Sequence, residues 1–405
     1  MAITRPSSSQ SGSRAVPAHH YGVAKWRHHV GPGLAKKRPN LCLYCTVCSR
    51  TAKLCTTPHR MRSGPFGRVA IRITAMDGLL FAPVAMEARS MGFRKTLMLS
   101  PLALVLAFGT AQAGEPASCQ KIHMADVGWT DNTAQNGLFN VVVSALGYKT
   151  KIDVLDLPVI LEGLKGKKLD LFLDNWLPSN EEGTKPYRDA HTVEELPPDL
   201  TDAPYGPVVP NYVAEAGVKD IKDLGPNAAK FNGKFYGIEP GNDGNKIVQK
   251  AIDDPKNEMK GYKLVESSEQ GMLAQAQKAM AKKEWIVFLG WAPHPVMAKM
   301  PITYLTGWDA MGFGASQIHP LTRVGYSAEC ANLGKLLANL KFTIPMESEV
   351  MDGISTNKDK DGDRAATAWL KANPVVLDKW LAGVTTFDGQ DGGAAVKKSL
   401  GISGS

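Results

Sequence analysis

The sequence predicts an α/β fold of two lobes, each a mostly parallel sheet flanked by helices. Between residues 121 and 291, short apolar runs with the alternation typical of strands take turns with segments of helical periodicity. A stretch rich in Pro, Asp, Glu and Gly, residues 178–210, divides this series into two. Three of the runs end in a tryptophan, at Trp129, Trp176 and Trp291. Because ligands bind outside the carboxyl ends of strands in such sheets, we expect the three indoles at one cleft.

The first series predicts a βαβαβ unit, whose crossovers should be right-handed. Gly147 follows the first helical pattern as a C-terminal signal, and Pro158 lies at a first-turn position of the second. The expected elements are a strand ending at Trp129, a helix over 131–146, a strand over 149–155, a helix over 158–167 and a strand over 169–173.

The second series begins near the end of the 178–210 stretch, which we interpret as the crossover between the lobes. Its expected elements are strands over 208–213, 234–238, 262–265 and 285–289, with helices over 218–224, 242–251 and 269–282. Beyond Gly307 the chain is expected to return to the first lobe, with helices over 332–340, 348–354 and 365–371 and a last one holding Trp380. Lobe I is therefore predicted to comprise residues 114–204 and 316–405, and lobe II residues 205–315.

Charge is divided unevenly along the chain. The formal net charge is +8, but residues 1–90 carry 14 Lys and Arg against Asp77 and Glu87. Residues 114–405 hold 31 Lys and Arg against 37 Asp and Glu, a net charge of −6. The basic pI is therefore no evidence for a nucleic-acid partner, and we expect none.

Residues 91–113 have the pattern of a secretory signal peptide. A basic start with Arg94 and Lys95 precedes the apolar run 97–108, and Ala111-Gln112-Ala113 forms a cleavage site. We expect an exported protein that begins at Gly114. Its apolar runs are too short to span a bilayer. Residues 1–90 would then lie upstream of the true start, and their composition is typical of disorder.

Six cysteines fall into two groups. Cys42, Cys45, Cys48 and Cys55 have a spacing that could bind zinc, but no hydrophobic framework surrounds them, and translated non-coding sequence is the better interpretation. Cys119 and Cys330 are the two that remain after the cleavage site. Cysteines of exported proteins usually pair, and the alternative is two unpaired buried thiols.

Several electron-rich ring faces around one site are what a cation such as a methylated ammonium needs, since one cation–π contact contributes only about 0.5–2 kcal/mol. Asp131, two residues after Trp129, either favours the start of its helix through the dipole or supplies a counter-charge, and both can hold. Asn242 is either a helix cap or a hydrogen-bond partner of a ligand. A metal site is not expected, because Asp359-x-Asp361-x-Asp363 lacks the glycine of a calcium loop.

Enzyme signatures are weak. The sequence contains no G-x-S-x-G, H-E-x-x-H or P-loop motif. His123 lies within a predicted strand and His294 between two prolines, with no evident nucleophile beside either.

Five motifs together resemble one family. These are ADVGWTD from Ala125, NW at Asn175-Trp176, YGIEPGNDGN from Tyr236, ESSEQGMLAQ from Glu266 and FLGWAPHP from Phe288. They are similar to the periplasmic substrate-binding proteins of choline and glycine betaine ABC transporters, most of all the choline-specific group. The resemblance runs over about 119–390 and implies a two-lobed, hinged type II binding-protein fold.

The resemblance also implies a site. An aromatic box for the trimethylammonium group corresponds to Trp129, Trp176, Tyr205 and Trp291, and Tyr205 enters on the resemblance alone. The acidic contact to the cation corresponds to Asp131, the contact to the choline hydroxyl to Asn242, and a disulfide to Cys119 and Cys330. The chain departs from the family's pattern over 178–195 and 308–323.

The function expected from the sequence is a periplasmic, monomeric, non-catalytic receptor. It would close around choline and present it to an inner-membrane ABC permease, without a cofactor. A glycine betaine or carnitine binder is the alternative within the class, and an exported enzyme acting on a quaternary amine is the alternative outside it.

Overall fold

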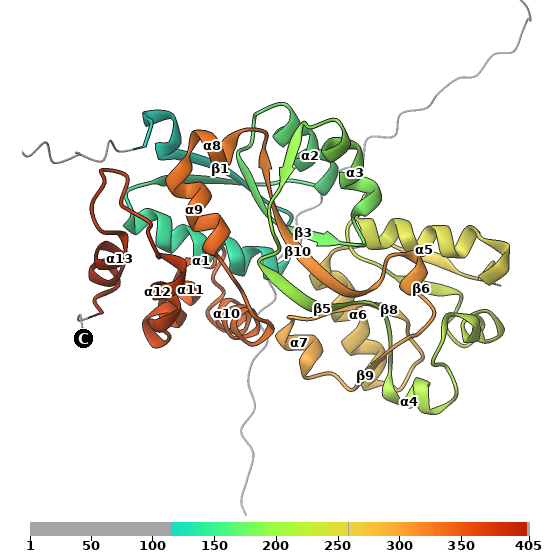
Figure 1. Ribbon diagram of the computed structural model, residues 1–405. Coiled ribbons are helices and arrows are strands. Elements are labelled where there is room, and N and C mark those ends of the chain that lie inside the picture. Colours follow the sequence, from blue (N-terminus) through green and yellow to red (C-terminus); the bar gives the residue numbers. More distant parts are fainter. Residues whose placement is uncertain (1–114, 258, 403–405) are drawn as a thin grey trace, which may run out of the picture. The chain divides into compact units, whose positions relative to one another are not determined.

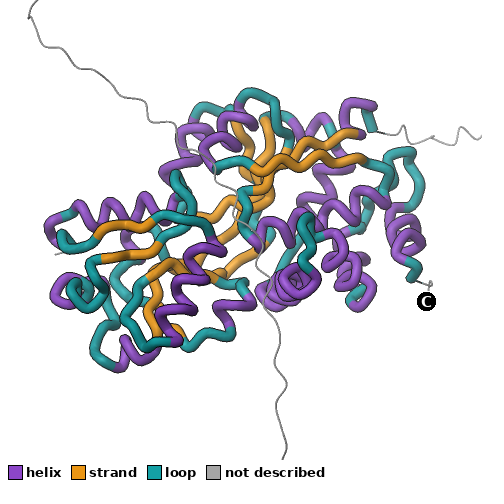
Figure 2. Tube along the Cα trace, turned by 180° about the vertical axis from the view of Figure 1, so that it is seen from behind, coloured by secondary structure: helices purple, strands orange, loops and turns teal. Residues whose placement is uncertain are grey.

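A computed structural model describes residues 115–257 and 259–402. Its strands form one ten-stranded mixed sheet of order β2-β1-β3-β10-β5-β8-β6-β7, with β4 beside β10 and β9 beside β5 (Figure 1). Figure 2 shows these strands as a curled band with helices against it. The predicted signal peptide 91–113 and the four cysteines of residues 42–55 lie outside the described residues.

One end of the sheet is parallel. Strand β1 (Lys121–Asp126) pairs with β2 (Lys149–Val154) in register from Lys121 opposite Lys149 to Asp126 opposite Val154, and with β3 (Leu171–Leu177) on its other side. Helices α1 (Thr130–Ala145) and α2 (Leu157–Lys165) connect these strands. The expected βαβαβ unit is confirmed. We call β1, β2 and β3 with α1 and α2 the first half.

The other end of the sheet is parallel as well. Strand β6 (Lys234–Tyr236) lies between β7 (Lys263–Val265) and β8 (Phe288–Trp291). Helix α5 (Asp243–Asp253) precedes β7, and α6 (Glu269–Ala281) precedes β8. We call these strands with α5 and α6 the second half.

Two long antiparallel strands join the halves, and neither was predicted in full. The strand predicted over 208–213 covers only the end of one of them, and residues 211–213 belong to a helix instead. Strand β5 (Leu200–Pro210) pairs with β10 (Gly314–Arg323) and with β8. Residues 178–210, where the sequence showed no regular pattern, also hold α3 (Glu181–Asp189) and β4 (Val193–Glu195).

The prolines of β5 explain the wrong prediction. Proline has no N–H to donate, so three of them within eleven residues predict a loop. In the structure they contribute their carbonyls instead: Pro204 O accepts from Ala292 N at 3.0 Å, and Pro207 O from Leu305 N at 2.9 Å.

The predicted lobe boundaries, 204/205 and 315/316, fall within these two strands. Tyr205 lies opposite Gly314, and Pro204 lies opposite Ala315. The two predicted boundaries therefore lie beside each other on paired strands. The division into lobes at these bounds stays a prediction.

The remaining α-helices and the remaining strand of the described residues are mostly C-terminal. They are α4 (Asn211–Glu215), α7 (Pro295–Ala298), β9 (Ile302–Tyr304), α8 (Tyr326–Glu329), α9 (Ala331–Asn339), α10 (Ile344–Asn357), α11 (Asp363–Ala372), α12 (Val375–Trp380) and α13 (Gly392–Leu400).

Helices α10, α11 and α13 contact α1, so the end of the chain returns to the first half as expected (Figure 1). Gly137 on α1 permits the closest approach, because a Cβ there would lie 2.7 Å from the backbone carbon of Gly362, in the turn before α11. No helix of the described residues is long and apolar enough to cross a membrane.

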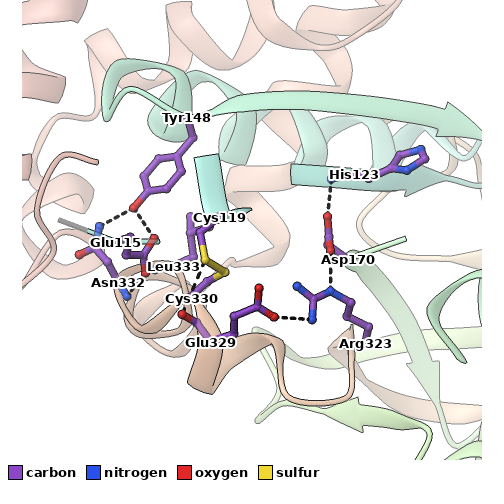
Figure 3. The surroundings of a disulfide bond; sticks show 10 residues. All are labelled: Glu115, Cys119, His123, Tyr148, Asp170, Arg323, Glu329, Cys330, Asn332 and Leu333. Atoms are coloured by element: carbon purple, nitrogen blue, oxygen red, sulfur yellow. Dashed lines mark hydrogen bonds and ion pairs between the residues drawn. A yellow bond between two sulfur atoms is a disulfide. The ribbon is translucent and has the colours of Figure 1, made fainter. Parts of the chain in front are cut away.

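A disulfide ties this returning segment to the start of the first half. Cys119, just before β1, is bonded to Cys330 between α8 and α9, with their Cα atoms 5.6 Å apart (Figure 3). Beside it, the Glu115 carboxylate accepts hydrogen bonds from the Tyr148 hydroxyl and from the backbone N–H groups of Asn332 and Leu333. The first and last parts of the domain are thus joined by covalent and polar contacts at one place.

Candidate functional site

Four aromatic rings and two carboxylates surround one small cavity. It is small, with an empty volume of about 250 Å³. Its lining residues are Trp129, Asp131, Trp176, Tyr205, Ile238, Asp243 and Trp291.

The topology of the sheet brings the four rings together. Trp129 is the last residue before α1, and Trp176 belongs to β3. Trp291 ends β8, and Tyr205 lies directly opposite it on β5. The first half and the second half therefore supply walls that face one another, and β5 places Tyr205 between them.

Edge-to-face packing fixes the orientation of three rings. The Tyr205 ring is 5.6 Å from that of Trp176 at 66°, and 6.2 Å from that of Trp291 at 89°. Gly244 at the start of α5 makes room for Tyr205, since a Cβ there would lie 2.0 Å from the phenol oxygen. Rings held this way keep their faces available to a guest without rearrangement.

Carboxylates anchor two of the indoles. The Nε1–H of Trp176 donates to Asp174 Oδ1 at 2.8 Å. The Nε1–H of Trp129 donates to Glu239 Oε1 at 3.1 Å, a contact between the first half and the residues that follow β6. The buried Nε1 of Trp291 has no hydrogen-bond partner among the described residues.

Acidic side chains are concentrated around the cavity. Asp131 is 1% exposed, and burial, followed by the proximity of Asp174 and Glu269, raises its pKa well above the ordinary value. Burial likewise raises the pKa of Asp243. No basic side chain is among the residues that line the cavity in the described chain. A cation that entered would be stabilised by these carboxylates, and it would in turn favour their ionised form.

Asn242 lies next to the cavity rather than on its lining. It caps α5, with its side-chain oxygen accepting from Asn245 N at 3.1 Å and lying 3.5 Å from the Tyr205 hydroxyl. Its neighbour Asp243 lines the cavity instead. The geometry thus shows the cap directly, and the predicted contact of Asn242 with a ligand stays a prediction.

The sequence analysis missed Asp174, Glu239 and Asp243. Asp174 had a usable signal, because a charged residue inside the apolar run LDLFLDNW must be satisfied when the strand is buried. Glu239 and Asp243 lie in the loop-like stretch IEPGND and carry no such signal.

A family comparison decides the class of this site. The model of the family described as the substrate-binding domain of an ABC-type glycine betaine transport system matches residues 120–372. The chain belongs to this family. Its members are periplasmic or extracellular substrate-binding proteins of transport systems, and the family is not one of enzymes.

Two individual proteins are similar to parts of this chain. The uncharacterized protein ORF1 of Chromohalobacter salexigens is 40% identical over 138 residues, which is 34% of this chain and 87% of that protein. The glycine betaine/carnitine transport binding protein GbuC of Listeria monocytogenes is 32% identical over 170 residues, 42% of this chain and 55% of that protein.

Solved structures show the same fold. An ABC-transporter choline binding protein in complex with choline is 45% identical, with a TM-score of 0.68 over 71% of this chain and all of that one. Lactococcal OpuAC complexed with glycine betaine is 27% identical, with a TM-score of 0.58 over 64% of this chain and 99% of that one. The predicted α/β fold of the type II periplasmic binding proteins is confirmed.

Proposed function

We propose that this substrate-binding protein captures choline between Trp129, Trp176, Tyr205 and Trp291 and delivers it to the permease of an ABC transporter. The observation that carries the proposal is the cavity in which these four rings meet two buried carboxylates, Asp131 and Asp243. Export through the predicted signal peptide, residues 91–113, is part of the proposal.

The charge of the cavity separates choline from its closest competitor. Both choline and glycine betaine carry a trimethylammonium head, which the ring faces attract. Betaine also carries a carboxylate, which would meet Asp131 and Asp243 with no basic residue in the lining to receive it. The ammonium head of either ligand favours the ionised form of Asp131 and Asp243, and the betaine carboxylate would then lie near like charges. The site should therefore prefer the ligand with a net positive charge.

The solved relatives agree with this preference. The choline-binding structure is 45% identical to this chain, whereas the one complexed with glycine betaine is 27% identical. Glycine betaine or carnitine remains the second candidate because the family description names a glycine betaine system.

Calorimetric titration of the protein with choline, acetylcholine, glycine betaine and carnitine tests the proposal. We expect choline to bind most tightly and betaine at least about tenfold more weakly, a difference of about 1.4 kcal/mol. Betaine binding as tight as choline binding would contradict the proposal. Turnover of choline, detected by NMR after incubation, would favour the enzyme alternative instead.

Removing one wall of the cavity tests the role of the rings. Trp291→Ala should weaken choline binding by about 1–2 kcal/mol, because one cation–π face is lost, and Trp291→Phe should recover part of the loss. Trp285→Ala is the matched control: Trp285 packs on Phe231 outside the cavity and should leave the affinity unchanged. A folded Trp291→Ala protein with wild-type affinity would exclude this wall.

A further inference from the structure

The carboxylate of Glu269 lies buried between the two halves of the sheet. Glu269 is the first residue of α6 and is 2% exposed. Its Oε2 accepts from the backbone N–H of Thr130 at 2.8 Å, and its Oε1 from the Thr130 hydroxyl at 2.5 Å. Oε1 is also 3.2 Å from Nε2 of His294, which is 3% exposed. Thr130 opens α1, so the contact joins the first half to the second across 139 residues of chain.

All three partners of this carboxylate present a hydrogen to it. A backbone N–H can only donate, and His294 Nδ1 already accepts from the N–H groups of Val296 and Met297 at 3.2 and 3.3 Å. The remaining hydrogen of the neutral imidazole is therefore on Nε2 and points at Glu269. A group that only accepts, an ionised carboxylate, fits this position, whereas an amide of the same shape would set an N–H against a donor.

The Thr130 end of the contact is the start of helix α1, where Asp131 Oδ1 accepts from the N–H of Asn132 at 3.1 Å and Glu269 accepts from the N–H of Thr130. The first N–H groups of an α-helix have no partner within the helix, and the partial positive charge there favours an anion. Glu269, which belongs to the second half, supplies both the acceptor and the negative charge. Thr130 stands between Trp129 and Asp131, which line the cavity, and the ring of His294 packs edge-on against Trp291 at 5.4 Å. The residues of this contact thus adjoin cavity-lining residues from both halves.

We propose that Glu269 is a positioning residue that clasps the two halves around the ligand. Its bonds to Thr130 exist only when the halves meet, so they stabilise the closed arrangement and slow its opening. The proposal rests on the proposed function, because it assigns to Glu269 the closure of the same cavity. Glu269 does not itself line that cavity.

The order of the three groups distinguishes the clasp from a catalytic relay. In a nucleophilic triad the imidazole lies between the hydroxyl and the carboxylate and removes the hydroxyl proton. Here the carboxylate lies between Thr130 and His294, so the imidazole does not reach the hydroxyl as a base.

Two exposed ion pairs provide matched controls. Each joins segments that lie far apart in the sequence, as the contact of Glu269 with Thr130 does. Lys299, directly after α7, bonds to Asp352 on α10 at 2.7 Å, and Lys250 on α5 bonds to Glu182 on α3. Lys299 and Asp352 are 72% and 53% exposed, and such pairs contribute little in water. If any cross-contact served equally well, breaking one of these pairs would have the same effect as changing Glu269.

The test compares Glu269→Gln, Thr130→Val, Thr130→Ser and the control Asp352→Asn. Choline affinity and dissociation rate are measured by calorimetry and stopped-flow tryptophan fluorescence, and exchange of the Thr130 amide hydrogen by NMR with and without choline. Thermal unfolding of each variant identifies any that fail to fold.

Glu269→Gln should weaken choline binding at least about tenfold, mainly through faster dissociation, and should remove the protection of the Thr130 amide. Thr130→Val should have a smaller effect, and Thr130→Ser and Asp352→Asn should remain within about threefold of wild type. A double substitution, Glu269→Gln with Thr130→Val, should bind no more weakly than Glu269→Gln alone.

The outcomes separate the clasp from the proposed function. If wild-type protein binds choline, and Glu269→Gln binds it equally well with the Thr130 amide still protected, the clasp is wrong and the function stands. If the wild type binds no quaternary amine, the function is wrong, and loss of Thr130 protection in Glu269→Gln still decides whether the contact holds the halves together.

Discussion

Asp131 lines the cavity, and its protonation state should control the affinity for a cation. In the ligand-free cavity, burial and the nearby Asp174 and Glu269 raise its pKa well above the ordinary value. A bound cation acts in the opposite direction, because an adjacent positive charge favours the carboxylate over the carboxylic acid. Binding of choline should therefore release protons, and choline affinity should fall as the pH falls through the raised pKa of free Asp131.

Substitution of Asp131 tests this linkage. Asp131→Asn should weaken choline binding by about tenfold or more and betaine binding much less, because a negative charge near the ammonium is lost while repulsion of the betaine carboxylate is also removed. Calorimetry in two buffers of different ionisation enthalpy should show release of up to about one proton per choline in the wild type and less in the variant. An equal loss for both ligands would leave Asp131 with its helix-start role only.

At the scale of elements, a line of buried acidic side chains connects α1, β3 and α10. The Gln135 amide on α1 donates to Asp174 Oδ1 on β3 and to Glu347 Oε1 on α10, each at 3.3 Å. Glu347 is fully buried, and its Oε2 has no hydrogen-bond partner among the described residues. Burial, together with the charges of Asp131 and Asp199, raises the pKa of Glu347 well above its ordinary value.

The raised pKa has a defined consequence for stability. In the unfolded chain Glu347 ionises in the ordinary carboxylate range, whereas in the folded protein it keeps its proton to higher pH. The folded state then holds more protons, so this contribution is fully present at low pH and is lost as the pH rises through the folded pKa.

Glu347→Gln should reverse that loss. The variant should gain about 1 kcal/mol or more of unfolding free energy at pH 8 relative to the wild type, and little at pH 4. Urea denaturation at a series of pH values measures the difference. Glu349→Gln, on the same helix but exposed, is the control and should leave the pH dependence unchanged. A gain at pH 8 no larger than that at pH 4 would contradict the assignment.

At the scale of the whole molecule, the disulfide constrains the chain more than any single packing contact. Cys119 and Cys330 are separated by 211 residues, so the bond closes most of the described chain into one loop. In the chain-entropy model such a loop stabilises the folded state by up to about 5 kcal/mol, and measured values are often smaller.

Replacing both cysteines tests that contribution. Cys119→Ser with Cys330→Ser should lower the free energy of unfolding by about 2–5 kcal/mol, because the unfolded chain gains freedom. Choline affinity at a temperature where the variant is folded should change little, since neither cysteine lines the cavity. Urea denaturation of the wild type under reducing conditions should reproduce the loss. Equal unfolding free energies for all three samples would show that the bond contributes nothing.

The strands that the sequence pattern predicted correctly are those of the parallel part of the sheet. The runs that became β1, β2 and β3 are apolar or alternating and are bounded by turns, and the helices between them carry the 3.6-residue period. Most of strand β5 could not be recognised, because Pro204, Pro207 and Pro210 predict a loop until a partner strand is present to use their carbonyls. The same segment carries Tyr205, so the residues alone did not place that ring.

The sequence by itself determined the two α/β series, the strand-end tryptophans Trp129, Trp176 and Trp291, and the family motifs around them, because hydrophobic period and turn residues are local properties. Only the tertiary structure decided what those residues meet. The antiparallel pairing of β5 with β8 places Tyr205 opposite Trp291. The approach of the two halves brings the Glu239 carboxylate to Trp129 and the Glu269 carboxylate to Thr130. Contacts between residues this far apart in the sequence depend on how the sheet curls and how its halves close, and no local pattern records that.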